Sequence, residues 1–479
     1  MKFKMTLWAA TSAAVFSLLL TATACKKTTA PATNVVNQTS PALSPEELRQ
    51  QRLAWNLKTL VEPYENAGFA NPAWDAPAKL ALTEFARARA KVLDDNEPSG
   101  QIIAKNAAAA VQAGCKDPMV TYLYIKFAMD QTNSKEAFTH AFVTMARTMN
   151  NSPYPPIRKF YAAIRTVDQL FFTYGTNSMS IPAVLEIEPW VAQNLMTTLQ
   201  DKSMPAVEAY EVGKEALKQL NWDTNNYAHA YSCIEKPLFA NWPDAYSSWL
   251  LKGEAYYQMG WNARGGGYAT NVSEQGWQVF FNNLAIAGNA LTNAWNINSN
   301  DERIPIQMIK VAEGAQKPRA EMEAWFNHAM TINPNCYEAC EDKLHYLYPQ
   351  WYGSRADMVS FGRECVASTN WGGIVPLILA DAHREYWLYA ADAEIKTNYW
   401  KRPDVWPDIQ AAFEKFFTLN PNAISYNHNY AWFAYKCEQW DKLNELIPKL
   451  GVVNYDYFGG KNEFSRMVQL TKEHVSNPK

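Results

Sequence analysis

Apolar residues recur every three or four positions along most of the chain, which is the spacing of a helix with one buried face. Two clear series run through residues 53–61 and 157–171. Just before the first series, Ser44 and Glu47 have the spacing of a capping box, a pair that stabilises the first turn of a helix. Alternating apolar and polar positions, which are typical of strands, are scarce. The pattern predicts an all-α fold with essentially no sheet.

The predicted helices of the second half are organised in pairs. Gly253, between large aromatic residues, is a position where a neighbouring helix can approach closely. This spacing resembles the first helix of a tetratricopeptide (TPR) repeat, and Asn333–Pro334 and Asn420–Pro421 resemble the stop after its second helix. The stops lie 87 residues apart, against about 34 per ideal repeat, so the spacing is irregular. The resemblance covers roughly residues 240–450 and implies stacked antiparallel helix pairs, a TPR-like α-solenoid.

A second resemblance is to a TPR-related domain of unknown function that occurs in bacterial proteins. It rests on four segments: Ala263–Gly267, Glu274–Trp277, Trp351–Ser354 and Phe361–Cys365. Because that family has no established activity, the resemblance implies an architecture and no function. We expect an N-terminal helical domain over residues 44–200 and a TPR-like helical repeat domain over residues 201–479.

The first residues have the three parts of a bacterial export signal. Lys2 and Lys4 are followed by the uncharged, mainly apolar stretch Met5–Leu20, and small residues then lead to Cys25. The stretch is too short to cross a bilayer, which takes roughly 20 apolar residues. We therefore expect residues 1–24 to be a signal peptide and the mature chain to begin at Cys25.

The residues before Cys25 resemble the lipobox of bacterial lipoproteins, in which this cysteine is acylated. Ala22 stands where leucine is usual, so the site also fits an ordinary signal peptidase, and both alternatives place the cut before Cys25. Residues 25–43 are rich in Thr, Ala, Pro and Asn, a composition that does not fold and suits a tether. We expect Cys25 to carry the lipid, palmitate included. Lys26 and Lys27 in place of aspartate imply the outer membrane by the same resemblance.

Charge limits the partners that we expect. The chain carries 44 Lys and Arg against 47 Asp and Glu, and removal of the signal peptide changes the net charge from −3 to −5. No basic cluster follows the tether, so we expect no nucleic-acid partner and contact with the membrane through the lipid anchor only. The chain is rich in aromatic residues, which either join helices or line binding surfaces.

The most distinctive local feature is the loop formed by Arg264, Gly265, Gly266 and Gly267. It interrupts a predicted helix pair where a short turn would suffice. Three glycines expose backbone N–H groups and permit positive φ, and the arginine adds a fork of donors. The loop is therefore a candidate site for a carboxylate or phosphate of a partner. The alternative is a flexible surface loop in which Arg264 pairs with an acid of this chain. No Lys-Ser/Thr follows, so the segment is not a P-loop.

Six cysteines besides Cys25 allow three interpretations: small buried residues at helix contacts, disulfides, or part of a zinc site. They are Cys115, Cys233, Cys336, Cys340, Cys365 and Cys437. Two cysteines four apart on a helix rarely bridge each other, and a structural zinc site needs tighter pairs. We expect the first interpretation, and neither a metal nor a cofactor.

Four polar residues, Asp381, His383, Arg384 and Glu385, lie in an otherwise apolar predicted helix. Asp381 and Glu385 share a face, as a general acid–base or metal-binding pair would. Alternatively, they lie on a solvated face or pair with a neighbouring arginine. The chain contains no serine nucleophile elbow, H-E-x-x-H motif or dinucleotide-binding fingerprint. We therefore expect a protein that is not an enzyme.

Three functions are consistent with these patterns. The leading hypothesis is a membrane-anchored helical-repeat scaffold of the bacterial cell envelope that binds a protein or peptide, because stacked helix pairs create a concave surface. The second is a glycan-binding outer-membrane lipoprotein, since the SusD-like family is likewise lipid-anchored, TPR-based and aromatic-rich. The third is an α/α polysaccharide-active enzyme, which needs two carboxylates at a defined separation.

Overall fold

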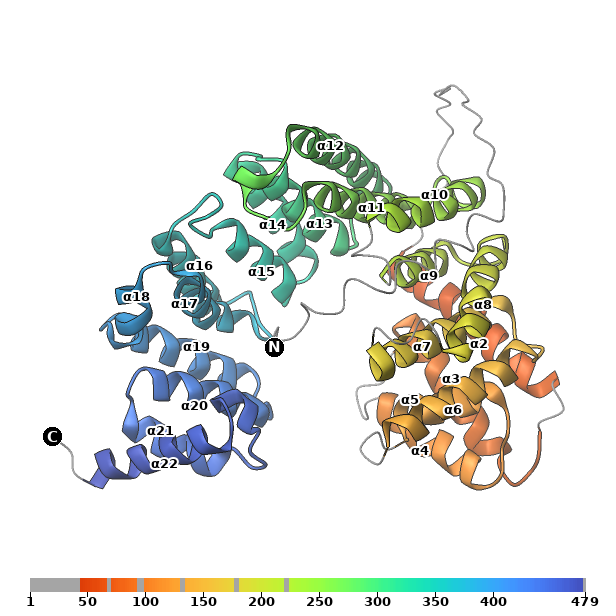
Figure 1. Cartoon of the computed structure of the whole chain (residues 1–479), viewed down its shortest axis with the longest axis horizontal. Helices are drawn as coiled ribbons and strands as arrows, with labels where there is room; N and C mark the ends of the chain where they lie inside the picture. The colour runs from red at the N-terminus through yellow and green to blue at the C-terminus, as the bar shows by residue number, and fades with distance from the viewer. Residues whose placement is uncertain are drawn as a thin grey trace. The chain divides into compact units, whose positions relative to one another are not determined.

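The computed structural model describes residues 44–66, 70–92, 99–129, 134–175, 181–218 and 224–476. Within these ranges the chain forms 21 α-helices, short 3₁₀ turns and no strand (Figure 1). The predicted all-α fold of helix pairs is confirmed. The predicted signal peptide (residues 1–24), Cys25 and the tether (residues 25–43) lie outside the described residues.

The helices divide into two compact units, and the first ends at Ser299. Its helices are α2 (Pro45–Asn66), α3 (Asp75–Ala90), α4 (Ser99–Gln112), α5 (Pro118–Phe127), α6 (Lys135–Asn150), α7 (Pro156–Tyr174), α8 (Pro182–Leu199), α9 (Ala206–Lys218), α10 (Thr224–Asn241), α11 (Tyr246–Arg264) and α12 (Glu274–Ile297), with the 3₁₀ turn η2 (Ala269–Asn271) between the last two. The boundary expected after residue 200 lies between α8 and α9, inside this unit.

The second unit spans Asn300–Lys479. Its helices are α13 (Arg303–Gly314), α14 (Arg319–Ile332), α15 (Tyr337–Tyr346), α16 (Arg355–Ala367), α17 (Ile378–Tyr389), α18 (Ala393–Asn398), α19 (Val405–Leu419), α20 (Asn427–Lys436), α21 (Trp440–Leu446) and α22 (Lys461–Ser476). Its 3₁₀ turns are η3 (Val375–Leu377), η4 (Tyr399–Lys401), η5 (Ile424–Tyr426), η6 (Ile447–Lys449) and η7 (Tyr455–Phe458). None of the helices in the described ranges of either unit combines the length and the apolar character that crossing a membrane requires.

Helix ends fall where the sequence predicts them. Ser44 and Glu47 form the expected capping box, because the Ser44 N–H donates to Glu47 Oε2 at 2.8 Å and the Glu47 N–H donates to Ser44 Oγ at 3.2 Å. Both Asn-Pro stops are also confirmed, since α14 ends just before Asn333 and α19 just before Asn420. The Asn420 side chain also links the end of α19 to Gly373, because it donates to the Gly373 carbonyl at 2.7 Å.

Successive helices pack against each other, and the most extensive of these contacts joins α11 and α12 in the first unit (Figure 1). Gly253 lies buried at this contact, where a Cβ atom would come within 2.5 Å of Leu291 Cγ. The close approach expected at Gly253 is therefore confirmed. A larger residue would have to displace Leu291, and overpacking of this kind costs about 1–3 kcal/mol.

Candidate functional site

The predicted Arg264–Gly267 loop follows α11 directly, and Gly265 ends the helix with φ of +76°. Arg264 Nη1 donates to the carbonyls of Gly265 at 3.1 Å and Gly267 at 3.0 Å. Its guanidinium also lies 5.2 Å from the ring centroids of both Trp261 and Trp277. No carboxylate among the described residues forms an ion pair with Arg264, so the expected intrachain acid is not found. The guanidinium instead holds the loop through backbone and aromatic contacts.

Asp381, His383, Arg384 and Glu385 lie on α17 as expected, and they belong to two separate groups of contacts. Asp381 is buried, accepts a short hydrogen bond from the Tyr337 hydroxyl and pairs with Arg384 at 2.7 Å. Arg384 also lies 3.2 Å from Glu385, so the two acids share one arginine. The second of the two interpretations, acids paired with an arginine, therefore describes their contacts.

His383 is fully buried and belongs to the other group. Its Nδ1 lies 2.8 Å from the Tyr399 hydroxyl and its Nε2 lies 3.0 Å from Asp408 Oδ2. Asp408 also accepts from Arg363 Nε at 2.9 Å. Burial lowers the pKa of His383 below its usual value, although the bond to Asp408 opposes the shift. We call these residues, with Arg355 and Asp404, the His383 cluster; it joins α16, α17 and α19.

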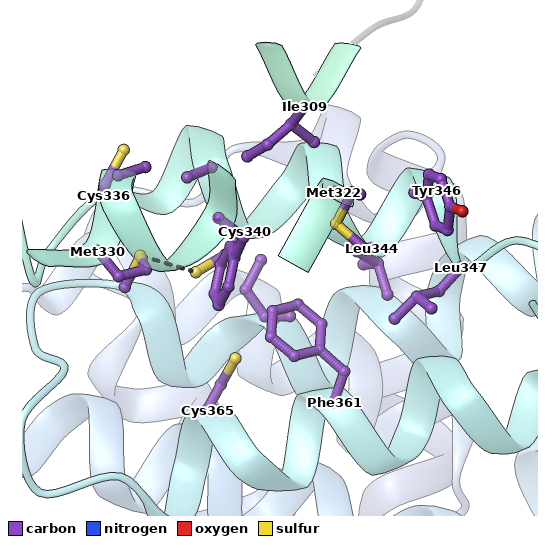
Figure 2. Close-up of a cluster of buried hydrophobic side chains, with 14 of the residues drawn as sticks. Ile309, Met322, Met330, Cys336, Cys340, Leu344, Tyr346, Leu347, Phe361 and Cys365 are labelled. Atoms are coloured by element: carbon purple, nitrogen blue, oxygen red, sulfur yellow. Dashed lines mark hydrogen bonds between the residues drawn. The ribbon is translucent and has the colours of Figure 1, made fainter. Parts of the chain in front are cut away.

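None of the six cysteines in the described part of the chain forms a disulfide, and five of them are buried. In the second unit, Figure 2 shows Cys340 turned toward Met330, with 3.7 Å between the two sulfur atoms, and Cys365 on the neighbouring helix facing the same apolar interior. Burial raises the pKa of Cys336 to about 12, which keeps the thiol protonated and unreactive. No three His, Cys, Asp or Glu side chains of the described residues could hold a metal ion together.

The first unit contains a small cavity that the sequence does not mark, and we call it the basic cavity. It has a volume of about 60 Å³, and α3, α5, α7 and α9 all contribute to its wall. Four of its lining side chains are cationic, two are carboxylates, and most of the others are aromatic. They are Phe85, Arg89, Met119, Tyr122, Lys126, Arg158, Tyr161, Ala162, Arg165, Glu211 and Glu215.

A buried carboxylate, Glu208 of α9, anchors one wall of the cavity. Arg52 Nε donates to Glu208 Oε1 at 2.9 Å, Asn56 Nδ2 donates to the same oxygen at 3.0 Å, and Arg89 Nη2 donates to Oε2 at 2.9 Å. Arg89 donates in addition to the Tyr161 hydroxyl at 3.0 Å. Burial by itself would raise the pKa of Glu208, but Arg89 and Arg52 outweigh it and lower this pKa to about 2. We call this group, with Arg158, the Glu208 cluster.

Arg158 is the least conventional member of that cluster, because it is 2 % exposed and no carboxylate of the described residues pairs with it. Its Nη2 donates to Asn56 Oδ1 at 2.7 Å and to Thr59 Oγ1 at 2.6 Å. Its Nε, like that of Arg89, is buried without a hydrogen-bond partner in the described structure. An unsatisfied buried donor costs about 1–3 kcal/mol. Burial, reinforced by nearby Arg89, lowers the pKa of Arg158 to about 10.

Lys126 is more exposed than Arg158 and likewise forms no ion pair within the described ranges. Its ammonium lies 5.2 Å from the Phe127 ring centroid and 5.8 Å from that of Tyr122. Desolvation by the cavity wall and repulsion from Arg165 lower the pKa of Lys126 to about 8. Arg165 itself is held by Glu215 at 2.9 Å. Cationic side chains therefore outnumber carboxylates in the cavity wall, so the carboxylates neutralise only part of the positive charge.

A second cavity in the same unit is larger, about 360 Å³, and its walls are mainly apolar. It lies between the start of α2, the segments before α9 and α11, and the end of α12, and its wall includes Trp242 and Tyr246. Arg52 lines this second cavity and also bonds to Glu208, so both cavities adjoin the Glu208 cluster.

The first helix differs in part from its expected packing, and the difference explains why the Glu208 cluster was not predicted. Of the periodic leucines that predict the buried face of α2, Leu60 is fully buried, but Leu53 and Leu57 are only half-buried. Arg52, Asn56 and Thr59 are buried instead, because they face α7 and α9. A polar stripe on a helix predicts a solvated face. Only the partners, about 100 to 156 residues away along the chain, reverse that prediction.

Comparison with known proteins gives one result for the second unit. Residues 302–369 are similar to a family described as a domain of unknown function (DUF4034). The match includes Trp351–Ser354 and Phe361–Cys365, two of the segments on which the expected resemblance rests, while Ala263–Gly267 and Glu274–Trp277 precede it. No curated protein matches the chain. The basic cavity lies outside the matched segment, which runs from α13 to the end of α16.

Proposed function

We propose that this protein is a membrane-anchored helical-repeat scaffold of the bacterial cell envelope that binds a protein or peptide partner. One observation carries the proposal: four alternate helices of the first unit, α3, α5, α7 and α9, contribute charged, hydroxyl and aromatic side chains to the wall of one basic cavity. Stacked helix pairs bind extended segments through the surface that alternate helices line. A lining of mixed polar and aromatic groups suits a peptide because it offers both hydrogen bonds and apolar contact.

The anchor part of this proposal rests on the predicted signal peptide and on Cys25. Replacement of Cys25 by serine removes the acylated thiol, so the protein should move from the membrane fraction to the soluble fraction of the envelope. Fractionation of cells that express each form measures this. A wild-type protein that is already soluble contradicts the anchor.

The partner part is tested by crosslinked capture from envelope extracts with three forms of the full chain. Wild type and Lys135→Met should recover the same partner, whereas Lys126→Met should recover much less of it. Lys135 is a suitable control because its ammonium also lies over an aromatic ring, 5.3 Å from the centroid of Phe172, but on α6, away from the cavity. Equal recovery by all three forms contradicts binding at the cavity.

A glycan is the second candidate partner, and one observation favours it. No charged residue occurs from Gln275 to Asn300, and exposed aromatic side chains lie beside this uncharged stretch. Tyr268 is 83 % exposed and Phe281 of α12 is 38 % exposed. Neutral sugars are bound by such combinations of aromatic faces and amides. Titration with a neutral polysaccharide, followed by tryptophan fluorescence, tests this candidate; a response that Phe281→Ala leaves unchanged argues against it.

A further inference from the structure

We propose that the basic cavity binds a single oxyanion, a carboxylate, phosphate or sulfate group. The cavity belongs to the surface on which the proposed function rests, and the inference names the chemistry that this surface recognises. The source of the oxyanion is either the bound partner or a free ion. The proposal rests on charge, on open donors, on the fixed positions of those donors and on size.

Charge is the first argument. The wall contains Arg89, Lys126, Arg158 and Arg165 against the two carboxylates of α9, Glu211 and Glu215. Counting the neighbours that pair with the wall does not reverse the balance. Arg52 and Glu208 cancel each other, and Asp168, 3.3 Å from Arg165, removes one further positive charge. The surroundings therefore carry a surplus of positive charge, which an anion would neutralise.

Open hydrogen-bond donors are the second and independent argument. The Nε atoms of Arg89 and Arg158 are buried and lack a partner in the described structure, although both residues line the cavity. Buried donors in proteins are almost always satisfied. A guanidinium has donors and no acceptor, so the group that completes these two must be an acceptor. An oxyanion is an acceptor of this kind, and it would also neutralise the surplus positive charge.

The donors are held in place by contacts outside the cavity, which is the third argument. Glu208 fixes Arg89, and Asn56 and Thr59 fix Arg158. Groups that are already oriented lose little entropy when a ligand binds, so they favour tight and selective binding. Lys126 is different because its ammonium lies over aromatic rings and forms no ion pair among the described residues. It is free to turn toward a bound anion.

Size limits the ligand. The cavity of about 60 Å³ has room for a group of a few heavy atoms. The oxyanion is then either a small free ion or the end of a longer molecule that continues along the lining helices.

Titration calorimetry of the full chain with sodium sulfate, inorganic phosphate and sodium acetate at constant ionic strength tests the proposal. At least one of these ions should bind with a stoichiometry of one. Lys126→Met should weaken that binding by about tenfold, because it removes one charge-assisted contact. Lys135→Met should leave it unchanged. Equal weakening by both variants would show general surface attraction and overturn the site, as would the absence of binding by all three ions.

Arg158→Met is a second test variant. If it folds, its affinity for the ion should fall further than that of Lys126→Met. A melting temperature recorded beside each titration separates loss of binding from loss of folding. An Arg158→Met protein that stays folded and keeps wild-type affinity overturns the proposal.

Competition separates this inference from the proposed function. Suppose that an ion binds and also displaces a captured partner; the oxyanion then comes from the partner, and both proposals stand. If an ion binds but no partner is captured, the oxyanion site stands and the proposed function fails. If a partner is captured and no ion binds or competes, the proposed function stands and the oxyanion site fails.

Discussion

The Glu208 cluster of the first unit and the His383 cluster of the second are groups of charged side chains around one buried residue, and they differ in how many of their hydrogen-bonding groups have partners. In the His383 cluster, both ring nitrogens of His383 have partners, and Tyr399 receives a second bond from Arg355 at 3.2 Å. Arg355 in turn pairs with Asp404 at 2.9 Å. In the Glu208 cluster, the carboxylate is saturated but two arginine Nε atoms are not.

This difference distinguishes a cluster that stabilises the fold from one that can bind a ligand. A saturated buried network fixes the helices that contribute to it and has nothing left to offer a ligand. Each arginine of the His383 cluster is paired, since Arg355 lies against Asp404 and Arg363 against Asp408. The Glu208 cluster adjoins a cavity with surplus positive charge. Evolution can tolerate the cost of open buried donors where function requires them, so the incomplete cluster is the better candidate site.

The largest effect should come from Glu208→Gln, which removes the charge at the centre of the incomplete cluster. Loss of one partner from a buried ion pair costs about 3–5 kcal/mol, because Arg52 and Arg89 remain buried without a counter-charge. Urea unfolding at pH 7 measures this. Glu62→Gln, at an exposed position of the neighbouring α2, should change nothing measurable. A loss below about 1 kcal/mol contradicts the central role of Glu208.

The same residue makes stability depend on pH. The pKa of Glu208 is about 2 in the folded protein and near 4.5 in an unfolded chain, so its contribution is fully present above about pH 4.5. It should be lost as the pH falls from 4.5 toward 2. Glu208→Gln should therefore lose less stability than wild type over this interval, and parallel losses would contradict the assignment.

A smaller effect is expected when the complete cluster is broken. Asp408→Asn weakens the hydrogen bonds from His383 and Arg363, and loss of a bond to a charged group costs about 1.5–3 kcal/mol. Urea unfolding measures the loss, with Glu364→Gln, at an exposed position of α16, as the control. Oxyanion affinity should not change, because the His383 cluster belongs to the second unit. A change in that affinity would contradict the division of roles between the two clusters.

The two clusters also mark the limit of what the sequence predicts. Helices and their ends follow from short-range patterns, so the capping box at Ser44 and the stop at Asn333 could be predicted. Gly253 could be predicted for the same reason, since the large aromatic residues near it on the same helix indicate a close helix contact. Arg158 could not, because it stands beside Lys159 near the start of α7, and nothing near it in sequence indicates its partners. One retrospective signal exists: a charged residue on the apolar face of a helix needs a buried partner.

A further prediction sharpens the comparison through pH. The pKa of Lys126 is about 8, because of desolvation and of repulsion from Arg165 and Arg89, which Glu215 opposes. Sulfate favours the charged ammonium, so its affinity should fall as the pH rises through about 8, by up to about tenfold. Tyr122, which also faces Lys126, has a pKa of about 12 and stays neutral in this range. Sulfate is the suitable probe because its own charge is constant there.

Calorimetric titration at pH 7 and pH 9 measures the effect, and Lys126→Met should show no such dependence. An affinity that falls equally in wild type and in Lys126→Met would assign the pH dependence to another group.

The smallest effect is expected at Arg264. Like the arginines of the His383 cluster, its guanidinium already has partners within the chain. It donates to two carbonyls of its own loop and lies over two tryptophan rings. Exposed cation–π contacts contribute about 0.5–1 kcal/mol each, so Arg264→Ala should cost about 1 kcal/mol. For a unit of this size the loss corresponds to a fall of roughly 2–4 °C in melting temperature. Oxyanion affinity should stay unchanged, because Arg264 does not line the basic cavity.

Arg264→Lys separates the two contributions within that small effect. Lysine keeps the charge over the rings of Trp261 and Trp277 but loses the planar fork that reaches two carbonyls. Its melting temperature should therefore lie between those of Arg264→Ala and wild type. If Arg264→Ala keeps full stability and instead reduces partner capture, the loop is a binding element in its own right. A complete set of intrachain contacts would then not suffice to identify a structural arginine, and the distinction drawn from the two clusters would fail.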